Sequence, residues 1–413
     1  MTNRILILLG LFLLLDIYVW MGTRGTFSNP TASNIYRWFY GISALLGYIG
    51  LFVMFSVFKD RSVPATLFQN ILMGFSFSFF VFKLLTGVFL LVDDLIRLGH
   101  FAFQWVYELF NSGSKETVSL DSRRNFIVKT GLAVASIPFA SMLFGITKGK
   151  YWYQVKKVAL NYPNLPKAFK GLKIVHISDV HSGSFDSKED VARGIQLINE
   201  QDADLILFTG DLVNNKAEEV EPYIDLFSSL NAKIGKFSSL GNHDYGDYVK
   251  WDSPEAKQAN MERLYANHEK MGFDLIRNEN RVISKDGESI KLVGVENWGR
   301  PPFPQHGDLN KALEGVNDEE FKVLLSHDPT HWDLEVLKHK TPVELTLSGH
   351  THGMQFGIEI PGWKWSPVKY IYKNWAGLYE KNNEKLYVNR GFGFLGFPGR
   401  VGIWPEITVI ELT

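Results

Sequence analysis

The most constraining feature of this sequence is the crowding of long apolar runs into its first 147 residues. Two runs contain no charged residue, one contains only Asp16, and one contains only Lys83. Spanning a bilayer takes about 20 mostly apolar residues. The alternative is a set of buried soluble helices, which is disfavoured because nothing comparable follows. The four runs are 38–58, 130–145, 5–20 and 63–92. The sequence therefore predicts an all-α transmembrane domain of about four helices over 1–147.

The chain changes character after Lys148. Lysines surround the aromatic triplet Tyr151–Tyr153, as is typical of a membrane–water interface. The stretch Asn161–Gly171 contains two prolines and indicates a connector. We therefore expect a linker over 148–171 and a second domain over 172–413.

The string beginning at Asp121 bears on orientation. Ser122, Arg123 and Arg124 precede an apolar stretch and resemble a twin-arginine export signal. Two cytoplasmic arginines beside a membrane helix are the alternative, as the positive-inside rule would give. Either interpretation predicts an inner-membrane protein whose second domain is extracytoplasmic. With four crossings the N-terminus would also lie outside, whereas an extra crossing through Leu95–Phe110 would place it inside.

Charge and composition exclude several classes of protein. The net charge of −1 argues against nucleic-acid binding through a general basic surface. The chain has no cysteine, so zinc–thiolate sites and cysteine nucleophiles are excluded. A metal would have to be held by His, Asp, Glu or Asn, which favours Mn, Fe, Zn, Mg or Ni.

Residues 172–413 read as a soluble α/β domain. Short apolar runs alternate with two amphipathic stretches at first, which predicts a βαβαβ core with parallel strands. The later strands come with fewer helices, so we expect a mixed sheet doubled into a sandwich. The expected strands are 172–178, 203–210, 235–241, 289–295, 321–326, 343–349, 385–391 and 406–412, and the amphipathic stretches are 188–199 and 217–230.

Five of these expected strands are followed directly by Asp, Asn or His. Each occurrence alone is weak evidence, since a strand-end Asp is often a cap and a strand-end His is often structural. Together they favour a metal site, because such donors would converge at the carboxyl edge of a sheet. The residues are Asp179 and His181, Asp211, Asn242 with His243 and Asp244, His327 with Asp328, and His350 with His352.

The ordered strings SDVHSG, TGDLV, GNHD, LLSHDP and SGHTHG, from Ser178 to Gly353, resemble the motifs of the calcineurin-like metallophosphoesterase superfamily. The C-terminal stretch from Leu386 is similar to a bacterial membrane-anchored branch of it. The resemblance implies a four-layer αββα sandwich and two divalent metal ions, with Mn, Fe or Zn as candidates. It implies that Asp179, His181, Asp211 and His352 bind the first ion, and that Asp211, Asn242, His327 and His350 bind the second.

The same resemblance gives His243 a catalytic role as the residue that protonates or stabilises the leaving oxygen. Asp244 follows it and is expected to orient its imidazole, and Asp328 and Thr351 are weaker candidates for similar support. We expect His350 and His352 to point the same way from an extended segment, one to each ion, because side chains two residues apart share a face of a strand.

The implied activity is metal-dependent hydrolysis of a phosphodiester or pyrophosphate bond by a hydroxide that bridges the two ions. Such ions, about 3.5–4 Å apart, stabilise the attacking and leaving oxygens. The membrane domain and the aromatic residues after His352 suggest a lipid-linked or other amphiphilic substrate, in contact with membrane lipids. No nucleic-acid or protein partner is expected. Two alternatives stay open: a non-catalytic membrane receptor or transport component, and a nucleotidase or nuclease.

Overall fold

The computed structural model describes residues 2–59, 65–110 and 121–413. The chain separates into two compact units. One unit comprises residues 1–58 and 68–144, and the other comprises 59–67 and 145–413.

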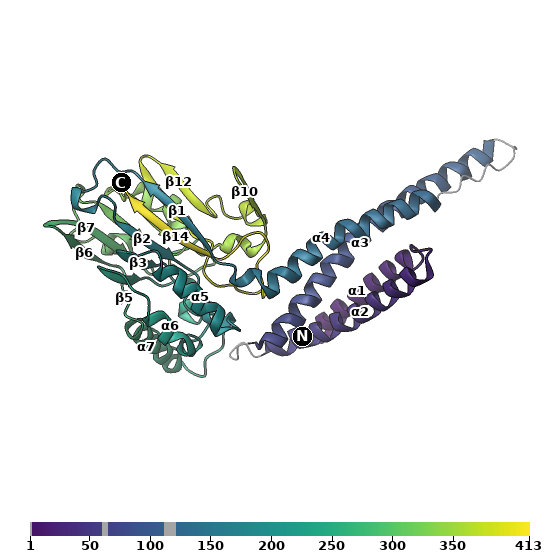
Figure 1. The fold of residues 1–413 in the computed structure, drawn as a ribbon, viewed down its shortest axis with the longest axis horizontal. Helices are drawn as coiled ribbons and strands as arrows, with labels where there is room; N and C mark the ends of the chain where they lie inside the picture. Colours follow the sequence, from purple (N-terminus) through teal and green to yellow (C-terminus); the bar gives the residue numbers. More distant parts are fainter. Residues whose placement is uncertain (1, 60–64, 111–120) are drawn as a thin grey trace. The chain divides into compact units, whose positions relative to one another are not determined.

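The regular elements of the first unit are all α-helices in its described residues (Figure 1). Three spans are long and apolar enough to cross a membrane: 30–57, 67–110 and 122–147. Residues Leu9–Thr23 form a shorter apolar helix. The helices are α1 (Thr2–Thr23), α2 (Pro30–Lys59), α3 (Leu67–Phe110) and α4 (Asp121–Thr147).

Helix α3 contains 44 residues, which at 1.5 Å per residue makes it about 66 Å long. The hydrocarbon core of a bilayer is only about 30 Å thick. Leu95–Phe110, considered above as an extra crossing, continues α3 and is not a helix of its own.

The two charged residues within the apolar runs neutralise each other. Both carboxylate oxygens of Asp16 in α1 lie 2.8 Å from the Lys83 ammonium in α3. From α2, Tyr48 donates a hydrogen bond to the same carboxylate at 2.7 Å, and Tyr40 donates another at 3.2 Å. Charges inside membrane-spanning helices are costly unless paired in this way. This cluster ties three helices together.

The second unit contains two six-stranded sheets. The first sheet has the order β1 (Gln154–Leu160), β14 (Glu406–Leu412), β2 (Lys173–Ile177), β3 (Leu205–Phe208), β4 (Gly235–Ser238), β5 (Asp274–Leu275). The second has the order β12 (Gly377–Lys381), β13 (Glu384–Val388), β9 (Leu345–Ser348), β8 (Lys322–Leu325), β7 (Glu288–Gly294), β6 (Glu279–Lys285). In each sheet the central strands that carry the predicted donors run parallel.

Three apolar cores define four layers. One core holds residues of both sheets, such as Leu207 of β3 and Leu347 of β9, so the sheets pack face to face. A second core joins the first sheet to helices α5 (Lys188–Asn199), α6 (Ile224–Ser228) and α7 (Pro254–Lys270). A third joins the second sheet to α8 (Leu309–Ala312) and α9 (Thr330–Leu334). This is the αββα sandwich expected from the resemblance.

Residues 148–171, expected to be a linker, contribute to the sheet. Strand β1 pairs in parallel with β14 over its whole length. Leu160, Tyr162, Leu165 and Phe169 are buried between the two sheets. The strand lies at an edge and carries two lysines, so it lacks the continuous apolar run of a central strand.

Candidate metal centre

The predicted donors follow strands β2, β3, β4, β8 and β9. Strands β2, β3 and β4 are parallel neighbours in the first sheet, and β8 and β9 are parallel neighbours in the second. Because the ends of parallel strands meet at one edge, side chains from five strands reach one place.

Several of these donors have left-handed backbone conformations. Such a conformation costs about 1–3 kcal/mol for a residue other than glycine and recurs at functional sites. The residues are Asp179 (φ 52°), His181 (φ 47°), Asp211 (φ 58°), His350 (φ 69°) and His352 (φ 50°). The chain thus turns sharply where each strand ends. The expectation that His350 and His352 lie on an extended segment is wrong, because β9 ends at Ser348 and His352 begins a short 3₁₀ turn.

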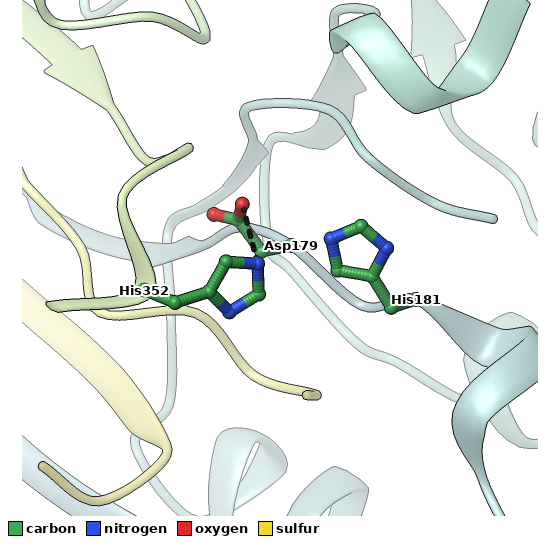
Figure 2. Close-up of side chains that lie close together, drawn as sticks. All are labelled: Asp179, His181 and His352. Carbon is green, nitrogen blue, oxygen red and sulfur yellow. Dashed lines mark ion pairs between the residues drawn. The ribbon is translucent and has the colours of Figure 1, made fainter. Parts of the chain in front are cut away.

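A first group of donors consists of Asp179, His181 and His352, all buried, with one donor atom of each within 4.8 Å of the others. Figure 2 shows the Asp179 carboxylate beside the ring of His352, with the ring of His181 facing them. Nε2 of His352 lies 3.2 Å from Oδ1 of Asp179.

A second group consists of Asp211, His327 and His350, again within 4.8 Å of one another. Oδ1 of Asn242 lies 2.9 Å from Nδ1 of His350. Two neighbouring ligand atoms about 2.1 Å from one ion would be separated by a similar distance. Asn242 therefore belongs with the second group, and Nδ1 is the nitrogen of His350 that faces it.

Asp211 lies between the two groups. Its Oδ2 atom is 3.5 Å from Nε2 of His181 and 3.1 Å from Nε2 of His327. Its Oδ1 atom accepts a hydrogen bond from the His243 backbone N–H at 2.8 Å. One carboxylate thus reaches a donor of each group, as a bridging ligand must.

The second ring nitrogens of three histidines have hydrogen-bond partners, and for His327 and His181 the partner is an oxygen that can only accept and so fixes the tautomer. Nδ1 of His327 donates to the Thr209 carbonyl at 2.7 Å, and Nδ1 of His181 donates to Oδ1 of Asn214 at 3.1 Å. Nε2 of His350 lies 2.8 Å from the Tyr372 hydroxyl. Such partners commonly orient metal-binding histidines and leave the other nitrogen free to bind.

His352 is held differently. Nη2 of Arg400 lies 3.1 Å from its Nδ1 atom, and a guanidinium can only donate. Nδ1 of His352 therefore accepts, and Nε2 carries the ring proton on the side of Asp179. For Nε2 to bind an ion, the ring proton would have to move to Nδ1, and Nδ1 could then no longer accept from Arg400.

Neighbouring positive charge stabilises the ionised form of the buried carboxylates. Burial opposes ionisation of Asp179, but the imidazoles of His352 and His327 outweigh it and hold the pKa of Asp179 below its usual value. The pKa of His327 is raised to about 10: burial opposes this shift, but the charges of Asp211 and Asp179 outweigh it. Divalent cations would supply the same compensation.

The donor set fits a pair of metal ions. Nε2 atoms of His181, His327 and His352 are buried and make no hydrogen bond among the described residues. A buried polar atom without a partner is unfavourable, and a metal ion would satisfy it. The combination of imidazole, carboxylate and amide donors suits Mn, Fe or Zn.

His243 lies beside the first group without belonging to it. Its ring centroid is 4.9 Å from that of His181 and 4.4 Å from that of Tyr248. Its Nδ1 atom donates to the Asn214 carbonyl at 2.7 Å, which leaves Nε2 as the free nitrogen.

Asp244 does not orient the His243 ring, contrary to expectation. Its carboxylate accepts backbone N–H groups of Gly241, Asp211 and Leu212 at 2.8–2.9 Å. It therefore holds the loops that carry Asp211 and Asn242. Burial, followed by the charge of Asp211, raises the pKa of Asp244 to about 7.

Asp328 and Thr351 make hydrogen bonds to neighbouring parts of the site. Oδ1 of Asp328 accepts from Thr330, while Oδ2 lies 3.5 Å from Nε2 of His350. Thr351 donates to the Trp375 carbonyl and so supports the turn that carries His350 and His352.

Sequence reasoning did not assign the groups that hold the histidines. No pattern in the sequence pointed to Tyr372, Arg400 or Asn214, and Thr209 begins the TGDLV string without a role of its own. The Thr209 and Asn214 contacts to His327 and His243 use backbone carbonyls, which any residue type supplies. For Asn214, the one signal in the sequence is its position three residues after the candidate ligand Asp211.

The fold and the paired donor groups define the class of the protein as a calcineurin-like metallophosphoesterase with a helical membrane region. A family model for calcineurin-like phosphoesterases matches residues 172–354. A second model, described as a probable transmembrane domain of calcineurin-like phosphoesterases, matches residues 3–150.

Individual relatives agree with both matches. The uncharacterized metallophosphoesterase YkuE of Bacillus subtilis is 34% identical over 256 residues, which are 60% of this chain and 81% of that protein. The chain therefore belongs to the calcineurin-like phosphoesterase family. A transmembrane protein with metallophosphoesterase domain from Bos taurus is 25% identical over 98% of this chain and 87% of its own length. The protein of the same name from Danio rerio is 27% identical over 65% of this chain, and the alignment spans only 60% of that relative.

Proposed function

We propose that this protein is a membrane-anchored phosphoesterase with two metal ions that hydrolyses a phosphodiester or pyrophosphate bond in a lipid-linked or other amphiphilic substrate. The observation that carries the proposal is Asp211, whose Oδ2 atom reaches donors of both groups. A single-ion binding protein has no need of such a bridge.

The geometry supports the residue roles in this proposal. The first ion would be held by Asp179, His181, Asp211 and His352, and the second by Asp211, Asn242, His327 and His350. The ions, when bound, would activate water and neutralise charge that develops on the phosphoryl group.

His243 acts as the general acid in this proposal. The Asn214 carbonyl accepts from Nδ1, so Nε2 is the nitrogen that would deliver a proton to the leaving oxygen. Its backbone is fixed by the hydrogen bond to Asp211, and the ring of Tyr248, tilted against it with centroids 4.4 Å apart, limits its rotation. A positioned acid of this kind accelerates a reaction by about 10²–10⁴-fold.

A cleft beside the second group supports an anionic substrate. The residues that line it include Arg300, Thr330, Asp333, Tyr372 and Lys373, and Tyr372 also contacts His350. Two cations and one carboxylate leave this cleft with net positive charge next to the candidate metal-binding His350, which suits a phosphate that remains charged throughout the reaction.

The membrane domain motivates the amphiphilic substrate and the inner-membrane location. We place the second unit outside the cytoplasm because Arg123 and Arg124 lie in the first turn of α4, ahead of its apolar stretch. Arg123 pairs with Asp93 at 3.3 Å, and Arg124 donates to the Gly22 carbonyl at 3.4 Å.

The test is a substrate panel with purified full-length protein supplied with Mn²⁺, Fe²⁺ or Zn²⁺. The panel contains a phosphomonoester, a phosphodiester, a lipid-linked pyrophosphate and a single-stranded oligonucleotide. Preferential hydrolysis of the lipid-linked compound, abolished by a chelator, is the expected result. Preference for the oligonucleotide, or no hydrolysis with both ions bound, would contradict the proposal.

A further inference from the structure

The segment 353–371 leaves the candidate metal centre and returns to it. It begins directly after His352 and ends before Tyr372, whose hydroxyl lies 2.8 Å from His350. Between these ends the chain forms the hairpin of β10 (Ile358–Ile360) and β11 (Trp363–Trp365). Figure 1 shows β10 as a separate finger of the second unit.

The hairpin has the reverse of the polarity expected for a surface hairpin. Its register pairs Glu359 with Lys364, which share one face, whereas the pairs Ile358–Trp365 and Ile360–Trp363 share the other. On exposed antiparallel hairpins the polar residues normally face water.

Here the charged face packs against the domain. Glu359 lies 2.9 Å from the Arg390 guanidinium, and the Lys364 ammonium lies 5.4 Å from the ring centroid of Trp375. Lys364 also donates to the Ala376 carbonyl. Burial lowers the pKa of Lys364 to about 8.

The apolar face is left exposed. Ile358, Ile360 and Trp363 expose 50%, 55% and 51% of their surface. Met354, Tyr370 and Ile371 in the same segment are also exposed. We call these six side chains the apolar rim.

The charges that remain exposed on 353–373 are those of Lys369 and Lys373, and both are positive. A surface of isoleucine, tryptophan and tyrosine bordered by lysines matches the chemistry of the interface of an anionic bilayer.

We propose that the apolar rim inserts into the interface of the lipid bilayer that anchors the chain, so that the metal centre takes a phosphoester whose lipid chain stays in the membrane. This substrate class rests on the proposed phosphoesterase function, whereas contact between the hairpin and lipid does not.

Contact with lipid can be measured in the full-length chain. The protein has no cysteine, so Ile360→Cys can be labelled uniquely with a bimane dye. Val282→Cys, on β6, is a matched control because Val282 is an apolar strand residue that is 56% exposed. In vesicles of phosphatidylcholine and phosphatidylglycerol, doxyl-labelled lipid should quench the dye at 360 at least about threefold more than at 282. Equal quenching at the two positions would overturn the proposal.

A second measurement separates this inference from the proposed function. The double variant Ile358→Ser, Ile360→Ser should hydrolyse a lipid-linked phosphoester in vesicles at least tenfold more slowly than the parent. Its turnover of water-soluble bis(nitrophenyl) phosphate should be unchanged, and Val282→Ser should behave as the parent with both substrates. Equal rates on the lipid-linked ester would overturn the proposed substrate route while leaving the phosphoesterase function intact. If the metal-loaded parent hydrolyses neither ester, the proposed function fails, and the quenching experiment still decides whether the rim contacts lipid.

Discussion

At the scale of single residues, the centre depends on hydrogen bonds that set which nitrogen of each histidine is free. Asn214 is central because its two oxygens serve two rings. Its side-chain Oδ1 accepts from His181, and its backbone carbonyl accepts from His243. The carboxylate of Glu219 in turn accepts the Asn214 N–H and fixes this loop.

Replacing the Asn214 side chain should therefore remove its contact with His181 while keeping its contact with His243. Asn214→Ala removes the acceptor for His181 but retains the carbonyl that holds His243. We expect affinity for the first metal ion to fall by about 10–100-fold, as for other residues that orient a ligand. Turnover at saturating metal should change little. Isothermal titration with Mn²⁺ together with activity at high Mn²⁺ checks this, and an undiminished affinity would show that the Asn214 side chain is dispensable.

His243 should behave in the opposite way. His243→Ala should retain both metal ions and lower turnover of a natural-type ester by about 10²–10⁴-fold. Esters with a nitrophenyl leaving group need less protonation and should lose less. His306→Ala is the matched control, since His306 packs on Tyr245, with ring centroids 4.4 Å apart. Parental turnover by His243→Ala would require another general acid.

Glycine is required where backbone and ligand meet. A Cβ atom at Gly349 would lie 2.1 Å from Oδ2 of Asp179, and one at Gly241 would lie 2.2 Å from Oδ1 of Asp211. Gly349→Ala should therefore displace Asp179 and lower metal occupancy as well as activity. Gly315→Asn is a suitable control, because Gly315 has open space around it and a left-handed backbone that asparagine tolerates. Full metal occupancy in Gly349→Ala, measured by elemental analysis, would contradict this.

At the scale of elements, the central strands of both sheets could be predicted from the sequence, whereas the edge strands could not. Strands such as β3 and β8 are buried on both sides and so read as continuous apolar runs. The donors after them were predictable for the same reason, because an Asp or His directly after such a run stands out. Strand β1 lies at an edge and carries two adjacent lysines, and it pairs with β14, which is far away in sequence. The left-handed turns of the ligands likewise depend on tertiary contacts.

The role of β1 can be tested with two truncated chains. A fragment of residues 148–413 retains β1, and one of residues 172–413 lacks it. Loss of β1 exposes the edge of β14 and removes Leu160, Tyr162 and Phe169 from the core between the sheets. Each large apolar side chain removed costs about 2–5 kcal/mol. We expect the longer fragment to unfold cooperatively on heating and the shorter one to aggregate; equal melting temperatures would contradict a structural role for 148–171.

At the scale of the whole molecule, the family match extends over both units, since one model covers the helical region and another the phosphoesterase domain. The alignment with the bovine relative covers 98% of this chain. The match thus covers a transmembrane region together with a phosphoesterase domain. Our proposal therefore gives the two units one common purpose, which is hydrolysis at a membrane.

The side of the membrane on which the second unit lies is a prediction about the whole molecule. An alkaline phosphatase that is active only outside the cytoplasm, fused after Thr413, should be active, and a green fluorescent protein that fails to mature after export should be dark there. Fusions of the same reporters after Phe110, in the stretch before Arg123, should give the reverse pattern. A fluorescent fusion after Thr413 would place the metal centre in the cytoplasm.

The central claim is that Asp211 bridges two metal ions. Anomalous scattering from crystals of the full-length protein grown with Mn²⁺ tests it most directly. We predict two peaks per chain, about 3.5–4 Å apart, one on each side of the Asp211 carboxylate. A single peak in crystals saturated with Mn²⁺, or two peaks of which neither contacts Asp211, would contradict the account.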